Sequence, residues 1–121
     1  MLLLQRANDA RRRGDISQAI TLYRQLQQMF PTSSEAVLSA APLGGLLLER
    51  GDARPALDQF DRYLHEAPAG VLVPEALYGR GRALRALGNA AEERRTWRRL
   101  VDAFPDSPYA PLAQRRLADL Q

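Results

Sequence analysis

The chain has 121 residues, a formal net charge of +3 and 45% hydrophobic residues, which is the balance of a folded chain rather than a disordered one. It holds 20 Leu, 19 Ala and 17 Arg but no lysine and no cysteine. This composition favours helices over strands and excludes disulfides, cysteine-ligated metals and thiol nucleophiles. With His65 as the single histidine, we expect no metal, no cofactor and no catalytic site.

Seven helices are predicted from runs of helix-forming residues between glycine and proline signals. In chain order they cover about 2–13, 16–29, 35–50, 53–67, 74–87, 90–104 and 108–120. A glycine follows each of the first, third and fifth helices, where a left-handed conformation would end the helix. A proline follows each of the second, fourth and sixth helices and stops it.

Two other prolines stand where a helix should begin, and one stands inside a helix. Pro74 and Pro108 each occupy a first helical position, the latter after the capping pair Asp106-Ser107. Pro42 lies inside the third predicted helix. We expect a kink there or a delayed start of that helix.

Four features recur at a spacing of 37 residues. They are the turn glycines Gly14, Gly51 and Gly88, the prolines Pro31, Pro68 and Pro105, the aromatics Tyr23, Phe60 and Trp97, and the small residues Ala7, Gly44 and Gly81. Such a period predicts stacked two-helix units that bury their apolar faces against one another. We expect one domain, 1–121, with repeats at about 1–34, 35–71 and 72–107. Residues 108–121 then form a helix that either caps the array or begins a fourth repeat.

These units resemble the tetratricopeptide repeat, whose pattern is W-x₂-L-G-x₂-Y…A-x₃-F…P. The second unit matches it at Leu43, Gly44, Ala56, Phe60 and Pro68. The resemblance implies an all-α, tetratricopeptide-like α-solenoid of three repeats plus a C-terminal helix. The third unit departs from the pattern, because Glu93 replaces the small alanine, and we expect looser packing there.

The repeat is 37 residues long instead of 34, and the extra residues follow the proline. Such lengthened links resemble those of bacterial envelope tetratricopeptide proteins, among them a Tol–Pal-associated cell-division coordinator and a lipoprotein of the outer-membrane β-barrel assembly machine. The Arg/Ala/Leu-rich composition also resembles repeat regions of bacterial anti-sigma regulators. This resemblance implies a periplasmic or envelope location, with the cytoplasm as the alternative. The longest uncharged run, 36–48, is too short to span a bilayer.

A binding groove follows from the same resemblance, because the first helix of each tetratricopeptide unit lines the concave face. The residues placed there are Asn8, Arg11, Leu48, Glu49, Tyr78, Arg82 and Arg85. Arginines at both ends would suit a protein or peptide partner that carries acidic groups. The function implied is that of a non-catalytic adaptor or scaffold.

A second surface is a basic patch on the sixth predicted helix, formed by Arg94, Arg95, Arg98 and Arg99. An arginine cluster raises the alternative of a basic helical repeat that binds nucleic acid. Against that alternative, Trp97, the aromatic residue among these arginines, is expected in the core, and no nucleic-acid motif is present. A solvated face or a contact with an acidic protein is preferred. Self-association into a homo-oligomer is the third alternative.

Overall fold

The computed structural model describes residues 2–121, and these residues form seven helices and no strand. Their bounds lie within two residues of the predicted ones. The helices are α1 (Leu2–Arg12), α2 (Ile16–Met29), α3 (Ser34–Glu49), α4 (Ala53–Glu66), α5 (Val73–Ala86), α6 (Ala90–Ala103) and α7 (Ala110–Asp119).

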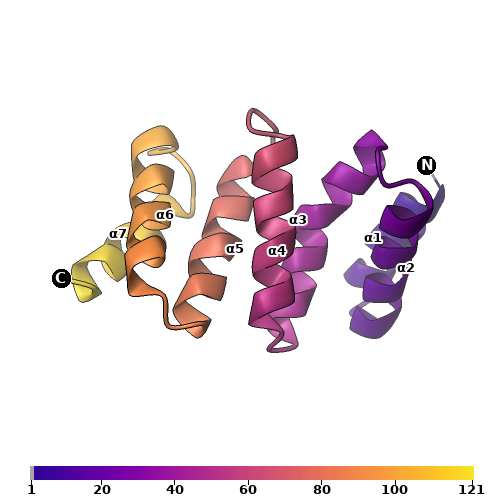
Figure 1. The fold of residues 1–121 in the computed structure, drawn as a ribbon, viewed down its shortest axis with the longest axis horizontal. Coiled ribbons are helices and arrows are strands. Elements are labelled where there is room, and N and C mark those ends of the chain that lie inside the picture. Colours follow the sequence, from indigo (N-terminus) through magenta and orange to yellow (C-terminus); the bar gives the residue numbers. More distant parts are fainter. Residues whose placement is uncertain (1) are drawn as a thin grey trace.

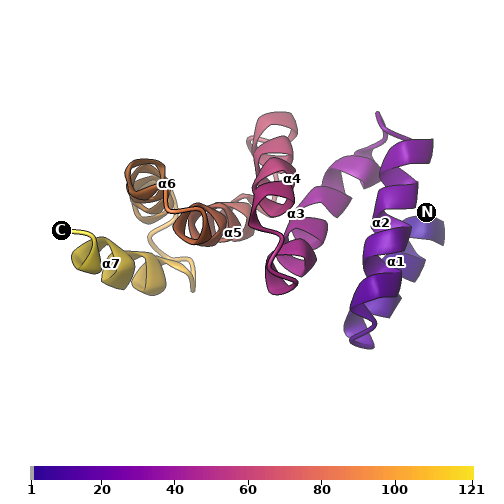
Figure 2. The same cartoon turned by 60° about the horizontal axis from the view of Figure 1, so that its bottom comes forward.

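The helices stack in chain order from α1 and α2 at one end to α7 at the other (Figure 1). Each helix packs mainly on its neighbours in sequence, and the first helices also meet, α1 with α3 and α3 with α5. Figure 2 separates two layers, with α4 and α6 above α3, α5 and α7. The predicted all-α, tetratricopeptide-like solenoid is therefore confirmed.

The turn inside each unit is a glycine C-cap. Gly14, Gly51 and Gly88 have φ of +78°, +85° and +75°, which is the left-handed region that favours glycine. After Gly14, the N–H of Asp15 donates to the carbonyl of Ala10 at 2.9 Å, and the other two turns repeat this bond. The prediction of left-handed C-caps is correct.

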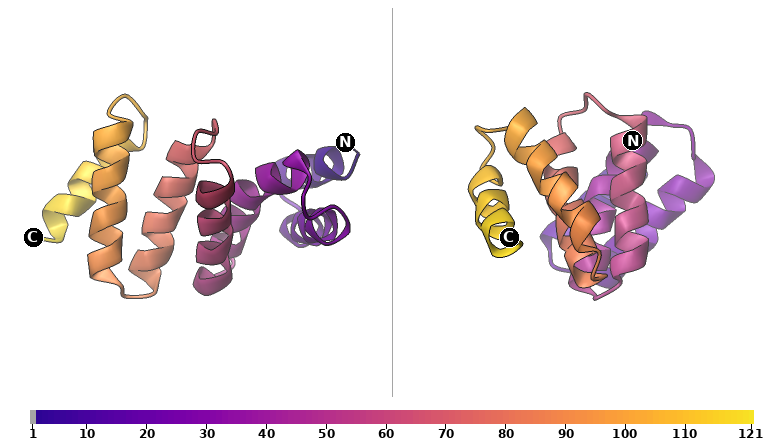
Figure 3. Two further views of the ribbon diagram at one scale, coloured as in Figure 1. Left: turned by 45° about the horizontal axis from the view of Figure 1, so that its top comes forward. Right: turned by 60° about the vertical axis from the view of Figure 1, so that its left-hand side comes forward.

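Helix α3 runs unbroken through Pro42, so the expected delayed start is wrong. Its N-cap is Ser33, whose hydroxyl accepts a hydrogen bond from the N–H of Ala36 at 3.1 Å. Pro42 has no N–H for the helical ladder, and the helix is bent near its middle (Figure 3). The last helix does start late, because α7 begins at Ala110 rather than at Pro108.

In the second and third units the aromatic of the second helix is buried where a glycine admits it. Phe60 is 3% exposed and lies where any side chain on Gly44 would sit, since a Cβ there would come within 2.7 Å of its ring. Trp97 fills the same position against Gly81 in the next unit. The small residues thus let the helices approach closely enough to enclose an aromatic ring.

Glu93 joins α6 to α7 instead of loosening the third unit. Its side chain is 1% exposed and accepts hydrogen bonds from Trp97 Nε1 at 2.8 Å and from Arg116 Nε at 2.6 Å. Burial alone raises the pKa of Glu93, but the bonds from Arg116 and Trp97 outweigh burial and lower it. The carboxylate therefore stays ionised and holds α7 in place.

Candidate binding groove

An open groove of about 680 Å³ crosses the first helices of all three units. We call it the groove. Its middle is apolar and comes mostly from α3, with Leu38, Ala41, Pro42 and Gly45 in the lining. The charged residues of the lining are Arg11, Glu49, Glu75 and Arg82, and none of the four forms an ion pair within residues 2–121.

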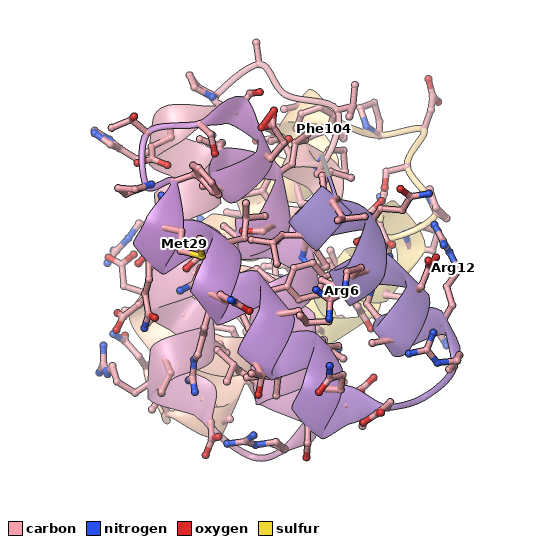
Figure 4. The ribbon with its side chains drawn as sticks, turned by 90° about the vertical axis from the view of Figure 1, so that its right-hand side faces the viewer. Arg6, Arg12, Met29 and Phe104 are labelled. Carbon is pink, nitrogen blue, oxygen red and sulfur yellow. The ribbon has the colours of Figure 1, made fainter. Side chains whose placement is uncertain are left out.

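The N-terminal end of the groove is held by the buried Tyr23 of α2. Arg11 Nε donates to the Tyr23 hydroxyl at 3.1 Å, and that hydroxyl donates in turn to Asn8 Oδ1. The view onto this end shows Arg12, one residue further along α1, extending into solvent (Figure 4). Arg11 is thus oriented by a core residue while its guanidinium keeps donors for a ligand.

The C-terminal end of the groove is aromatic. The Tyr78 and Tyr109 rings are stacked with centroids 4.6 Å apart, and the Arg82 guanidinium carbon lies 5.4 Å from the Tyr78 centroid. Burial raises the pKa of Tyr109, and the nearby Glu75 carboxylate raises it further. Tyr109 therefore remains neutral at physiological pH. The two stacked rings supply apolar surface beside one cation, Arg82, and one anion, Glu75.

Five of the seven residues predicted for the groove line it, namely Asn8, Arg11, Glu49, Tyr78 and Arg82. Leu48 and Arg85 lie outside this lining, and partner binding by any of the seven residues stays a prediction. Leu48 and Arg85 occupy the same repeat position, about 60° around the helix from the lining residues Gly45 and Arg82. Leu48 packs instead beside the buried cluster of Leu57, Ala83 and Leu84.

Sequence reasoning missed Tyr109 and Leu38, which both line the groove. Tyr109 follows Leu72, another lining residue, by 37 positions, so the repeat period itself was the signal that could have found it. Leu38 is 40% exposed. It lies within the uncharged run 36–48, where no charged residue distinguishes the groove side of the helix from its buried side.

The predicted basic patch lies on the second-helix layer, away from the groove. Arg95, Arg98 and Arg99 are exposed and Arg94 is half-buried. Arg95 pairs with Glu92, whereas the other three have no ion-pair partner in the part of the chain that the structure describes. Its role stays a prediction.

Glu92 and Asp61, on the second helices, are used in ion pairs. Glu92 pairs with Arg95 and Arg80, and the bond from Arg95 is the main reason that its pKa is lowered. Asp61 accepts from Arg80 at 2.6 Å. Among residues 2–121 no group of three or more acidic, His or Cys side chains could hold a metal ion. No described helix is long and apolar enough to cross a membrane.

The repeated helix pairs, the enclosed aromatics and the groove along the first helices define a tetratricopeptide-repeat protein. The profile of the YfiO family, described as outer membrane lipoprotein, matches residues 1–121. The chain therefore belongs to the YfiO outer membrane lipoprotein family, and the expected resemblance to envelope tetratricopeptide proteins is confirmed.

Longer proteins match this chain over part of their own length. The chain is 35% identical over 103 residues to cellulose synthase 2 operon protein C of Komagataeibacter xylinus, covering 85% of this chain and 8% of that protein. A tetratricopeptide repeat protein from Parabacteroides merdae superposes with a TM-score of 0.79 at 23% identity, over 98% of this chain and 44% of that one. The structure of a MamA RS-1 double mutant also superposes with a TM-score of 0.79, at 20% identity, over 98% of this chain and 65% of that one. These two structures bear on the fold alone.

Proposed function

We propose that this chain is a non-catalytic adaptor that holds an extended or helical segment of a partner protein in the groove. The observation that carries the proposal is that one open groove draws its lining from the first helices of all three repeats. A surface continuous over three units suits a segment of several residues. Family membership supports a place in the bacterial cell envelope.

The chemistry of the two ends supports a partner with acidic groups. Arg11 and Arg82 stand at opposite ends of the lining with apolar surface between them. Arg11 is oriented through Tyr23, and Arg82 lies over Tyr78, so each guanidinium is partly ordered before binding. Ordered donors lose less entropy when they bind a carboxylate. Glu49 and Glu75 in the same lining would restrict where the acidic groups of the partner can lie.

The experiment begins with peptides selected from a random twelve-residue phage library on the immobilised chain. We expect enriched peptides to contain Asp or Glu and to lose about three- to tenfold in affinity for Arg82→Glu. Gly45→Trp should block the groove, because nothing lies within 4 Å of a Cβ at Gly45. Gly45→Ala and Arg98→Glu, which changes the basic patch, serve as matched controls and should bind normally.

Peptides that bind both Arg82→Glu and Gly45→Trp as tightly as the unchanged chain would show that the groove is not the binding site. Loss of binding to Arg98→Glu alone would move the site to the basic patch instead.

A further inference from the structure

The links between units build a second pocket beside the groove. The links 67–72 and 104–109 have six residues each, whereas the turns inside the units have three. Between them lies a pocket of about 420 Å³, which we call the loop pocket. Glu75 and Tyr109 line both the loop pocket and the groove, so the two adjoin along a common wall. The long links between the units thus form a pocket that the short turns inside the units could not form.

The loop pocket is formed in the free chain, because both links satisfy much of their own backbone. In 104–109, the N–H of Ser107 donates to the carbonyl of Phe104 at 3.0 Å, and the N–H of Tyr109 donates to Ser107 Oγ at 3.1 Å. In 67–72, the N–H of Leu72 donates to the Tyr63 hydroxyl at 3.0 Å. Prolines in both links fix further φ angles. A pocket held in this way needs little ordering when a ligand enters.

The wall of the loop pocket is mostly apolar. Phe104, Tyr109 and three prolines contribute to it, and Val71 projects from its rim with 85% of its surface exposed. Val71 is the most exposed of the large hydrophobic residues in the part of the chain that the structure describes. An apolar side chain of about the size of Leu or Phe would cover it and bury further surface against Phe104.

The charged part of the lining is exclusively acidic. Glu75 and Asp106 are the two charged residues of the loop pocket, and both are exposed. Neither forms an ion pair within residues 2–121. The chain as a whole carries 17 arginines and a net charge of +3. The charge of the loop pocket is therefore opposite in sign to the net charge of the chain, and the two unpaired carboxylates favour a cationic ligand.

We propose that the loop pocket is a second docking site, for a segment of a partner protein with an apolar side chain next to an arginine or lysine. The apolar side chain packs on Val71 and Phe104, and the cation lies between Glu75 and Asp106. The groove, with Arg11 and Arg82, favours ligands that carry acidic groups. The two sites therefore differ in the charge of the ligand that each would bind. The loop pocket does not depend on the groove being occupied.

The test is an NMR titration of ¹⁵N-labelled chain with three short probes: acetyl-Phe-Arg-amide, acetyl-Phe-Glu-amide and acetyl-Ala-Arg-amide. We expect acetyl-Phe-Arg-amide to shift the amides of Val71, Asp106 and Ser107, which do not line the groove, with an affinity about fivefold above that of acetyl-Phe-Glu-amide. Acetyl-Ala-Arg-amide should bind more weakly by a similar factor, because it lacks the apolar ring. The amides of Asn8 and Leu38, in the groove, should stay in place.

Variants separate the two parts of the proposal. Val71→Ser should weaken acetyl-Phe-Arg-amide about threefold, and Asp106→Asn should reduce the preference for arginine over glutamate to about twofold. Leu87→Ser and Asp58→Asn are matched exposed controls that should change nothing. Absence of shifts at Val71, Asp106 and Ser107 with every probe at millimolar concentration would overturn the proposal that the loop pocket binds a ligand.

Two further outcomes would also overturn the proposal. Equal affinities for the arginine and glutamate probes would show that the loop pocket has no preference for a cationic ligand. Shifts confined to groove residues would show that the probe binds in the groove instead. Because Val71 and Asp106 do not line the groove, the peptides selected on the groove should bind Val71→Ser and Asp106→Asn normally. Failure of the loop pocket is thereby distinguishable from failure of the adaptor function.

Discussion

The attachment of α7 should depend on the pair formed by Glu93 and Arg116. Arg116 donates to the Glu93 carboxylate through Nε at 2.6 Å and through Nη2 at 3.2 Å. Glu93 is 1% exposed, so little water can replace these donors. Arg116→Met keeps an apolar stem of similar length and removes both bonds, which leaves the buried carboxylate with Trp97 as its remaining side-chain partner.

The size of the loss follows from the kind of bond. Hydrogen bonds to a charged group contribute about 1.5–3 kcal/mol, and the two bonds of one guanidinium are not additive. Arg116 is partly exposed, so we expect Arg116→Met to lower the free energy of unfolding by about 2–3 kcal/mol. For a chain of this length that corresponds to a decrease in Tm of roughly 8–12 °C if unfolding is cooperative.

The assay combines thermal melting with hydrogen exchange, because a terminal helix of a repeat array can open on its own. Protection should fall first in residues 110–119 and last in α1 and α2. The double variant Glu93→Ala, Arg116→Met places alanine where the first two units have Ala19 and Ala56, and it should recover part of the loss. A change in Tm below about 2 °C, with unchanged protection of α7, would refute the reasoning.

Three other predictions concern stability. The pKa of Glu93 is lowered below its ordinary 4.5, so its contribution to stability is present above pH 4.5 and is lost as the pH falls through the lowered pKa. The Tm should therefore decrease steeply between pH 7 and pH 3, and it should decrease less for Glu93→Gln. Gly44→Ala should destabilise by about 1–3 kcal/mol in denaturant titrations because a Cβ meets a buried ring, whereas Gly45→Ala should be neutral or slightly stabilising; the reverse order would contradict the packing. Arg94→Glu replaces a like-charge pair with Arg98 and should stabilise by about 0.5 kcal/mol at low salt, with no gain at high salt.

The helices and their order were predictable because their ends carry local chemistry. A positive φ at Gly51, for example, is a property of the backbone that glycine alone adopts easily, so the sequence and the turn match one to one. The same holds for Asn89, whose side chain accepts from the N–H of Glu92 at 3.2 Å and caps α6. Because such signals recur at a spacing of 37 residues, the stacking of the units was predictable as well.

The groove was only partly predictable because its lining depends on helix rotation, which no local signal encodes. Leu48 and Arg85 lie on the right helices, yet their side chains face the neighbouring unit or solvent outside the groove. Tyr109 falls in the last predicted helix, 108–120, but lies in the link before α7, and its place against Tyr78 depends on how α7 returns to the array. These contacts join residues far apart in sequence.

The third unit shows how a departure from a repeat pattern can serve the end of an array. In the first two units the position is alanine, and Ala19 and Ala56 are fully buried between helices. At the same position Glu93 reaches Arg116 on α7, a helix that buries only Ala110 and Ala113 of its own residues. Leu117 and Leu120 add partly buried contacts with the core, but α7 buries no large side chain completely. An ion pair at the position of a packing residue therefore adds to the apolar attachment of α7, the helix that follows Tyr109 and its stacking on Tyr78 in the groove.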